Sequence, residues 1–189
     1  DCDGNYGGAI LVDCTGVCGG GQAACNSSDA DGNGYSNITI GTQTWHKQNL
    51  KTTKYNNGDD IPNETYDGLW TQLTTGAWSS YDNDSSYVPI YGRLYNYYAI
   101  DDDRGVCPAG YRVSNDEDWK TLEIYLGMDE SVANGEHWRG TVEGGKIKAT
   151  ENWDSPNIGA TNESGFTAYP AGSRISATGD FINFGRETD

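Results

Sequence analysis

The most informative stretch of this sequence is Gly159-Ala160-Thr161-Asn162-Glu163-Ser164-Gly165-Phe166. Two further segments precede it in the chain. The first is Ile40-Gly41-Thr42-Gln43-Thr44-Trp45 followed by Asn49-Leu50-Lys51-Thr52, and the second is Cys107-Pro108-Ala109-Gly110-Tyr111-Arg112-Val113. Each segment alone is a weak signal, but several separated motifs in one order form a more specific pattern.

Together these segments resemble the Fibrobacter succinogenes major paralogous domain, a bacterial surface-protein module related to C-type-lectin-like and formylglycine-generating-enzyme-like folds. The resemblance covers residues 29–189. It implies a C-type-lectin-like α+β domain in an extracellular or cell-surface protein, and it names no ligand. Because domains of this family usually continue into a segment with a final cysteine, it also implies that residues 29–189 lack the C-terminal end of the domain.

The chain is strongly acidic. It has 12 lysine and arginine residues against 28 aspartate and glutamate residues, a formal net charge of −16. Such a surface repels nucleic-acid phosphates and anionic membranes, and it attracts cations and partners with basic patches. The sequence has no run of 18 or more apolar residues and therefore predicts no membrane-spanning segment. Nucleic acid is not an expected partner.

Residues 1–28 form a separate segment rich in glycine and cysteine. The pattern Asp-Cys-x-Gly-x-x-Gly-Gly occurs at residues 1–8 and again at residues 13–20. Repeats this short cannot bury a core, and arrays of them commonly act as stiff spacers. Closely spaced cysteines in such a segment indicate two disulfide bonds, with three possible pairings, among Cys2, Cys14, Cys18 and Cys25. The alternative is a zinc site made by the same four thiolates.

Several short elements are predicted downstream, and together they indicate an α+β fold. Residues 37–45 alternate apolar and polar side chains, which predicts a strand interrupted at Gly41-Thr42, as in a hairpin. A short helix is expected at residues 91–100, after Pro89. Short strands are expected at residues 146–149, 166–169 and 181–184.

The clearest helix signal covers residues 115–126. Ser114 is the predicted N-cap, and Glu117 three residues later completes a capping box. Gly127 stands where a left-handed C-terminal cap is favoured. The apolar stripe of this helix is expected to face the core and consists of Trp119, Leu122 and Leu126.

An acidic loop resembles the first half of a calcium-binding loop, with oxygen ligands at alternate positions at Asp29, Asp31 and Asn33. A similar pattern occurs at Asp1, Asp3 and Asn5. Calcium is therefore a possible cofactor. The loop fails as an EF-hand, since its twelfth position is Ile40 instead of an acid. Two alternatives remain: a partial calcium loop completed by distant acids, as in thrombospondin-type repeats, and an ordinary turn rich in aspartate and asparagine.

Tyrosine is abundant between residues 81 and 98. Aromatic side chains can form platforms that bind sugar rings or protein surfaces, and they can equally fill a core. Polar neighbours favour exposure of Tyr81 and Tyr87, which with Trp78 are the candidate ligand-binding residues. The residues expected in the core are Tyr91, Tyr95 and Tyr98.

These features predict a secreted bacterial surface or extracellular-matrix module for adhesion or assembly. The alternative is a carbohydrate-binding module of a polysaccharide-degrading system. We do not expect an enzyme, because the oxidases with a related fold use cysteines in their C-terminal half and this sequence has none after Cys107. The expected partners are a protein or glycan on a surface, or a second copy recruited through an open edge of the strand at residues 37–40.

Overall fold

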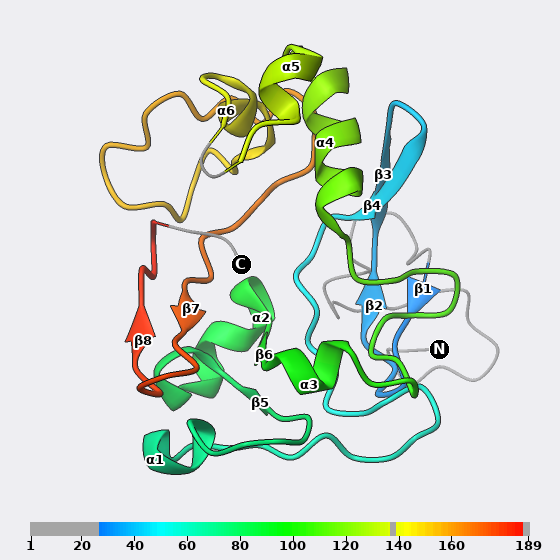
Figure 1. Cartoon of the computed structure of the whole chain (residues 1–189), viewed down its shortest axis with the longest axis vertical. Helices are drawn as coiled ribbons and strands as arrows, with labels where there is room; N and C mark the ends of the chain where they lie inside the picture. The colour runs from blue at the N-terminus through cyan, green and yellow to red at the C-terminus, as the bar shows by residue number, and fades with distance from the viewer. Residues whose placement is uncertain (1–26, 137–138, 187–189) are drawn as a thin grey trace, which may run out of the picture.

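The computed structural model describes residues 27–136 and 139–186, which have the predicted mixed α+β architecture (Figure 1). Within these ranges the strands pair into separate antiparallel two-stranded sheets. These are β1 (Ser27–Ser28) with β2 (Gly34–Tyr35), β3 (Asn37–Ile40) with β4 (Gln43–His46), β5 (Trp78–Ser79) with β6 (Leu94–Tyr95), and β7 (Ser173–Arg174) with β8 (Phe181–Ile182). The finer assignment to the C-type-lectin-like folds stays a prediction.

The helices of the described residues are mostly a single turn long. They are α1 (Asp67–Trp70), the 3-10 turns η1 (Tyr81–Asn83) and η2 (Ser85–Tyr87), α2 (Val88–Tyr91), α3 (Tyr97–Ile100), α4 (Asp116–Tyr125), α5 (Glu130–Ala133) and α6 (Glu143–Ile147). In the view of Figure 1, α4, α5 and α6 lie at the top, and α1, α2 and α3 lie at the bottom. No helix in the described ranges combines the length and the apolar character that are needed to cross a bilayer.

The predicted hairpin is confirmed. Strands β3 and β4 pair in the register Ile38 with Trp45 and Ile40 with Gln43, so that the interruption falls on the two turn residues in between. Ile40 is buried, and Ile38 and Trp45 pack against the same apolar cluster. Alternation of side chains across a strand thus places the isoleucines together on the inner face.

Helix α4 is also confirmed, with its cap one residue later than predicted. Asn115, not Ser114, is the N-cap: its side-chain oxygen accepts from the backbone N–H of Asp118, and the Asp118 carboxylate accepts from the backbone N–H of Asn115. Asparagine and serine are similarly good N-caps, so the choice between adjacent candidates is set by the backbone around them. Gly127 follows the helix with a positive φ of 109°.

The first core lies between α4 and the hairpin. It contains buried Ile40, Leu122 and Leu126, and the rings of Trp45, Trp119 and Phe166 pack beside them. The Trp45 ring centroid lies 5.0 Å from that of Trp119 and 5.5 Å from that of Phe166. The apolar stripe predicted for this helix therefore faces the core. Phe166, the last residue of the motif at residues 159–166, joins that motif to the same core.

The motif at residues 159–166 packs against α6 beside this core. Backbone N–H groups of Thr161 and Asn162 donate to the carbonyl of Gly145, and Ser164 donates to the carbonyl of Lys146. A Cβ atom at Gly145 would lie 2.1 Å from the carbonyl oxygen of Gly159. The close contact explains why this position of α6 is a glycine.

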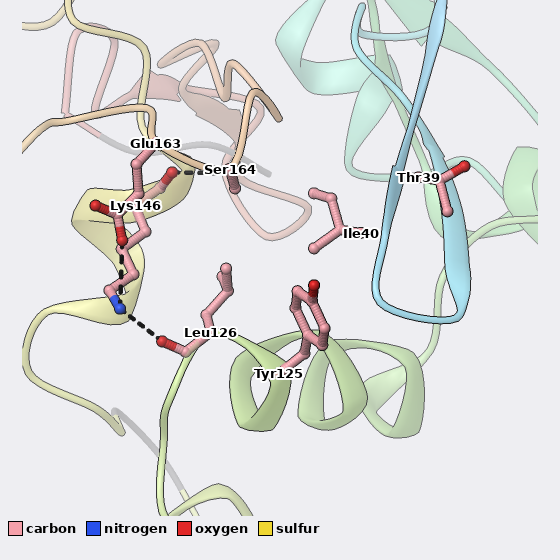
Figure 2. Close-up of a pocket in the computed structure, with 7 residues that line it drawn as sticks. All are labelled: Thr39, Ile40, Tyr125, Leu126, Lys146, Glu163 and Ser164. Atoms are coloured by element: carbon pink, nitrogen blue, oxygen red, sulfur yellow. Dashed lines mark hydrogen bonds and ion pairs between the residues drawn. The ribbon is translucent and has the colours of Figure 1, made fainter.

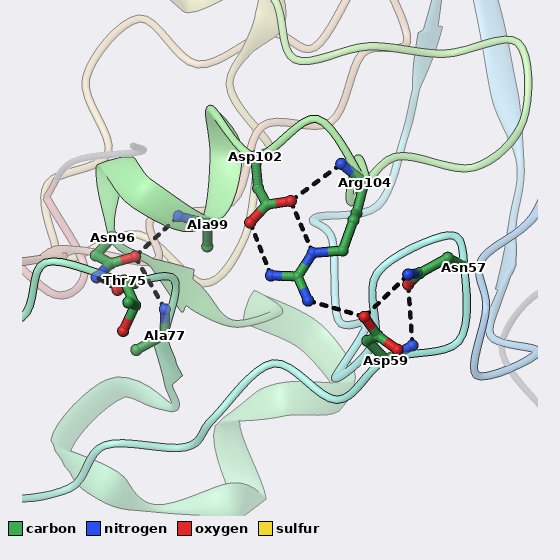
Figure 3. Close-up of polar contacts among 8 residues, drawn as sticks. All are labelled: Asn57, Asp59, Thr75, Ala77, Asn96, Ala99, Asp102 and Arg104. Carbon is green, nitrogen blue, oxygen red and sulfur yellow. Dashed lines mark hydrogen bonds and ion pairs between the residues drawn. The ribbon is translucent and has the colours of Figure 1, made fainter.

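The prediction of one helix at residues 91–100 is wrong. Helix α2 ends at Tyr91 because Gly92 takes up φ 72° and ψ −154°, which leaves the helical region. Strand β6 follows, and a new helix, α3, begins after Asn96. The Asn96 side chain accepts from the backbone N–H groups of Ala77 and Ala99 and donates to the carbonyl of Thr75 (Figure 3). One asparagine thus caps α3 and ties it to the segment just before β5.

Two of the predicted C-terminal strands are also corrected. The first half of residues 146–149 belongs to α6, and what remains is an isolated parallel bridge between Lys148 and Ala168. The same bridge is all that forms in the predicted strand at residues 166–169. The third prediction holds in part, since β8 covers Phe181 and Ile182.

The second core lies under α3 and the β5–β6 sheet. Its buried members are Tyr55, Ile61, Ala99 and Val106, with Leu50, Trp78, Tyr95 and Cys107 packed against them. Cys107 forms no disulfide bond within the described residues. The expectation that Tyr98 is a core residue is wrong, because 44% of its surface is exposed. Helix α3 buries Ala99 and leaves its tyrosines on the outer side.

Candidate functional site

The predicted calcium loop is a closed hydrogen-bonded turn. The buried carboxylate of Asp29 accepts from the backbone N–H groups of Asp31 and Asn33, from the Asn33 amide, and from the hydroxyl of Tyr35 at 2.6 Å. Asp31 turns away and accepts from the backbone and hydroxyl of Thr53. The structure therefore does not direct these three oxygen donors at one point, and calcium binding here stays a prediction.

Other predicted residues lie outside the described part of the chain. These are the second acidic pattern, Asp1, Asp3 and Asn5, and the four cysteines Cys2, Cys14, Cys18 and Cys25. Among the residues that are described, no group of three or more histidine, cysteine, aspartate or glutamate side chains is placed to hold a metal ion.

Tyr81 and Tyr87 belong to a cluster of tilted and T-shaped ring contacts and are half-buried, so their predicted exposure is wrong. Both pack on Phe184, with ring centroids 4.7 Å and 4.8 Å away, and Tyr91 packs on the same ring at 4.7 Å. Phe181 closes the cluster against Tyr81 at 5.3 Å. The cluster thus joins η1, η2 and α2 to the C-terminal strands.

Trp78, the third candidate, is half-buried in the second core. Its indole N–H donates to the carbonyl of Ile61 at 2.9 Å, and the guanidinium of Arg93 covers its ring at 4.4 Å from the centroid. This tryptophan therefore offers no open platform. Arg93, which covers its ring, lines the cavity described next.

A cavity of about 340 Å³, which we call the aromatic cavity, lies between the two C-terminal strands and the β5–β6 region. Its walls come from α1, α2, β6, α3 and β7, which Figure 1 shows in the lower part of the molecule. The apolar walls combine the aromatic residues Trp70, Tyr91 and Tyr95 with aliphatic residues such as Ile100, and the charged side chains are Arg93 and Arg174. Two of the six arginines of this acidic chain thus line one cavity.

Arg174 is a structural residue of this cavity. Its side chain is 1% exposed and forms an ion pair with Asp67 at 2.9 Å. The remaining donors reach the carbonyls of Glu64 and Gly179, and the guanidinium lies over the Trp70 ring at 4.3 Å. Because a buried charge must be paired, this arrangement satisfies Arg174 within the protein.

Arg93 is satisfied only in part. Its Nη1 donates to the carbonyl of Lys51, while its Nε is buried and has no hydrogen-bond partner. All six arginines of the sequence are described, and each of the other five forms an ion pair with a carboxylate. Among the described residues, Arg93 has no carboxylate partner.

Arg104, in contrast to Arg93, has carboxylate partners for its guanidinium. It also lies over an aromatic ring, that of Tyr55, at 3.8 Å from the centroid. Its guanidinium binds both oxygens of Asp102 and one oxygen of Asp59, as Figure 3 shows. This network lowers the pKa of the Asp102 carboxyl to about 2, through the hydrogen bonds from the Arg104 side chain and then from its backbone.

A second hollow, of about 410 Å³, lies beside the first core and is drawn in Figure 2. We call it the motif hollow, since Thr39, Ile40, Glu163 and Ser164 of the sequence motifs line it together with Tyr125, Leu126 and Lys146. Its cation is fully engaged: the Lys146 ammonium donates to the carbonyl of Leu126 at 2.8 Å and pairs with Glu163 at 3.3 Å. The hollow therefore has no unpaired charge to offer.

The sequence interpretation missed the residues that line the aromatic cavity. Tyr91, Arg93 and Tyr95 stand at alternate positions, a spacing that places side chains on one face of an extended chain. That signal was available, but a helix assigned to the same residues separates the three side chains around its axis. Trp70 and Arg174 come from distant segments and carry no local signal.

The fold and the cavity define a small α+β domain made of short elements around two apolar cores. A model of the Fibrobacter succinogenes major domain matches residues 38–189, which is most of the chain. The chain therefore belongs to this family, as its motifs predicted. No curated protein and no solved structure matches it.

Proposed function

We propose that this chain is a secreted bacterial surface or extracellular-matrix module for adhesion or assembly, and that its ligand binds in the aromatic cavity. The observation that carries the proposal is the Arg93 guanidinium, which has no carboxylate partner among the described residues and lies in the wall of a mainly apolar cavity. Apolar pockets with a few well-placed polar groups are the usual form of ligand sites. The acidic composition and the cysteine-rich first 28 residues support a location outside the cell.

The proposed role is binding without catalysis. The sequence has no cysteine after Cys107, whereas the oxidases of related fold use cysteines in their C-terminal half. Burial raises the pKa of the Cys107 thiol, which favours its unreactive protonated form. Both features support a binding module.

Val113 offers a way to test the cavity without disturbing the core. It lines the cavity and is 41% exposed, so Val113→Trp should obstruct the opening while the protein stays folded. Val142→Trp is the matched control, because Val142 is 60% exposed and does not line the cavity. On an array of extracellular-matrix proteins, we expect saturable binding by the natural chain and by the control, and a loss of about tenfold or more in V113W. Equal binding by all three proteins would assign adhesion to another surface.

A carbohydrate-binding module is the second candidate, and one observation favours it. Tyr97 and Tyr98 on α3 are 65% and 44% exposed, and their ring centroids lie 6.0 Å apart. Exposed tyrosines of this kind can stack on the apolar faces of sugar rings. Sugar-specific signals on a glycan array that disappear in Tyr97→Ala and Tyr98→Ala would support this function. Signals lost instead in Tyr81→Ala or Tyr87→Ala would place the sugar on the ring cluster that the sequence indicated.

A further inference from the structure

We propose that the aromatic cavity binds a carboxylate carried by a compact apolar group, with Arg93 as the residue that recognises the carboxylate. The inference rests on the proposed function, in which this cavity is the ligand site. It adds the chemical class of the ligand, which the adhesion proposal leaves open.

The charge of Arg93 favours a carboxylate as the ligand. Five of the six arginines already hold a carboxylate of the protein, and Arg93 holds none among the described residues. A chain with 28 acidic residues has many carboxylates that could pair with it. A guanidinium presents a planar fork of donors that matches a carboxylate, and such charge-assisted hydrogen bonds are among the strongest in proteins.

The position of the Arg93 guanidinium also favours a carboxylate ligand. Stacking on Trp78 and donation to the Lys51 carbonyl hold the guanidinium in one orientation before a ligand arrives. A group that is already oriented loses little conformational entropy on binding. Arg93 lines the cavity, and its buried Nε has no hydrogen-bond partner among the described residues. A carboxylate in the cavity would pair with the charge of the guanidinium, which no carboxylate of the described residues neutralises.

The residues of the cavity wall indicate that the rest of the ligand is apolar. The walls formed by Trp70, Tyr91, Tyr95 and Ile100 offer mainly carbon, and the donors of Arg174 are engaged by Glu64, Asp67 and Gly179. A sugar acid carries hydroxyl groups that would need many hydrogen-bond partners in this space. An apolar body with a single carboxylate needs only one polar contact. Two sources share this chemistry: a free aromatic or aliphatic acid, and the C-terminal residue of a peptide.

The test compares acids with their neutral amides. By nuclear magnetic resonance titration of the full chain, we expect 4-phenylbutyrate to shift the indole signals of Trp70 and Trp78 and to bind about tenfold more tightly than 4-phenylbutyramide. A tetrapeptide ending in phenylalanine, as the free acid and as the C-terminal amide, distinguishes the peptide source from the free acid. A uronic-acid disaccharide is the third arm. If it binds more tightly than the apolar acids, the assignment of the ligand class is wrong.

Variants of Arg93 assign the effect to one residue. Arg93→Met should weaken 4-phenylbutyrate binding about tenfold, and Arg93→Lys should restore only part of it, because an ammonium lacks the guanidinium fork. Arg186→Gln is the matched control, since it removes one positive charge at an exposed arginine that does not line the cavity, and it should bind within about twofold of the natural chain.

Val113→Glu is a second variant that tests the proposal if the Arg93 variants misfold. It adds a negative charge at an exposed position of the cavity wall, where it should weaken binding of the acid more than binding of the amide. Equal affinities for acid and amide in every protein would overturn the role of Arg93 while leaving the cavity as a ligand site. An absence of shifts with every probe overturns the inference as a whole, and the V113W array experiment then decides separately on the proposed function.

Discussion

The motif hollow and the aromatic cavity lie in different halves of the molecule, and each has a cationic side chain in its wall. In the motif hollow, Lys146 is paired with Glu163 and with the last turn of α4. In the aromatic cavity, Arg93 lies on Trp78 and donates to the carbonyl of Lys51, and no carboxylate of the described residues pairs with it. The half that holds the motif at residues 159–166 thus pairs its cation internally. The other half, in which Asn49, Leu50 and Val113 of the remaining motifs line the cavity, leaves Arg93 without a carboxylate partner among the described residues.

This difference separates residues that specify the fold from residues that are available to a ligand. The motif at residues 159–166 has an identifiable structural role, because it docks on α6 through the Gly145 carbonyl and places Phe166 in the first core. A motif that identifies a family can therefore report packing alone. Recognition of a ligand is better sought where a polar group is buried without a partner.

The largest effect is expected from breaking the core on the motif side. Leu122 is 1% exposed, and Leu122→Ala should lower the free energy of unfolding by about 3 kcal/mol, through lost burial and the void that remains. Ile124→Ala on the exposed side of α4 should cost less than about 1 kcal/mol. Urea denaturation followed by tryptophan fluorescence measures both. Equal losses in the two variants would mean that α4 does not bury the face described here.

A smaller effect should come from the contact between α6 and the motif. Gly145→Ala directs a methyl group at the carbonyl of Gly159 and should destabilise the protein by about 2 kcal/mol. Gly144→Ala is the matched control, since a Cβ atom there meets nothing within 4 Å and a helical glycine gains up to about 1 kcal/mol as alanine. The two variants should therefore differ in sign. Thermal unfolding of both, side by side, tests this directly, and a stable G145A protein would show that the motif loop is free to move.

The polar edge of the motif hollow should contribute little. The ion pair of Lys146 and Glu163 spans 3.3 Å, and the Glu163 side chain is 57% exposed. Exposed pairs of this kind are typically worth less than about 1 kcal/mol. Glu163→Gln should therefore lower the free energy of unfolding only slightly, and by less in 1 M salt than in dilute buffer. A salt-independent loss above about 1 kcal/mol would show that the carboxylate has a further role in this hollow.

The sequence predicted the hairpin and α4 of the motif half because their signals are local, but it did not predict α6, where a strand was expected at residues 146–149. Alternating side chains define the hairpin, and the cap and apolar stripe define α4, although the choice between Ser114 and Asn115 depended on backbone geometry that the residue types do not reveal. The cavity half escaped prediction for a physical reason. Its elements are two to four residues long, which is too short for a periodic pattern, and Gly92 and Asn96 set their limits through contacts with other segments. The cavity itself needs Trp70 and Arg174, which only the folded chain brings together.

The smallest effect, expected at acidic pH, compares Arg104 with Arg93. Because Arg104 lowers the pKa of the folded-state Asp102 carboxyl from near 4 to about 2, the pair stabilises the protein fully above about pH 4 and loses that contribution as the pH falls towards 2. The difference in unfolding free energy between the natural chain and Asp102→Asn should therefore shrink between pH 5 and pH 2.5, as measured by urea denaturation at each pH. Arg93→Met should show no such shrinkage, because no protein carboxylate among the described residues pairs with Arg93. If the difference for R93M follows pH as that for D102N does, Arg93 has a carboxylate partner in solution and the contrast between the two arginines fails.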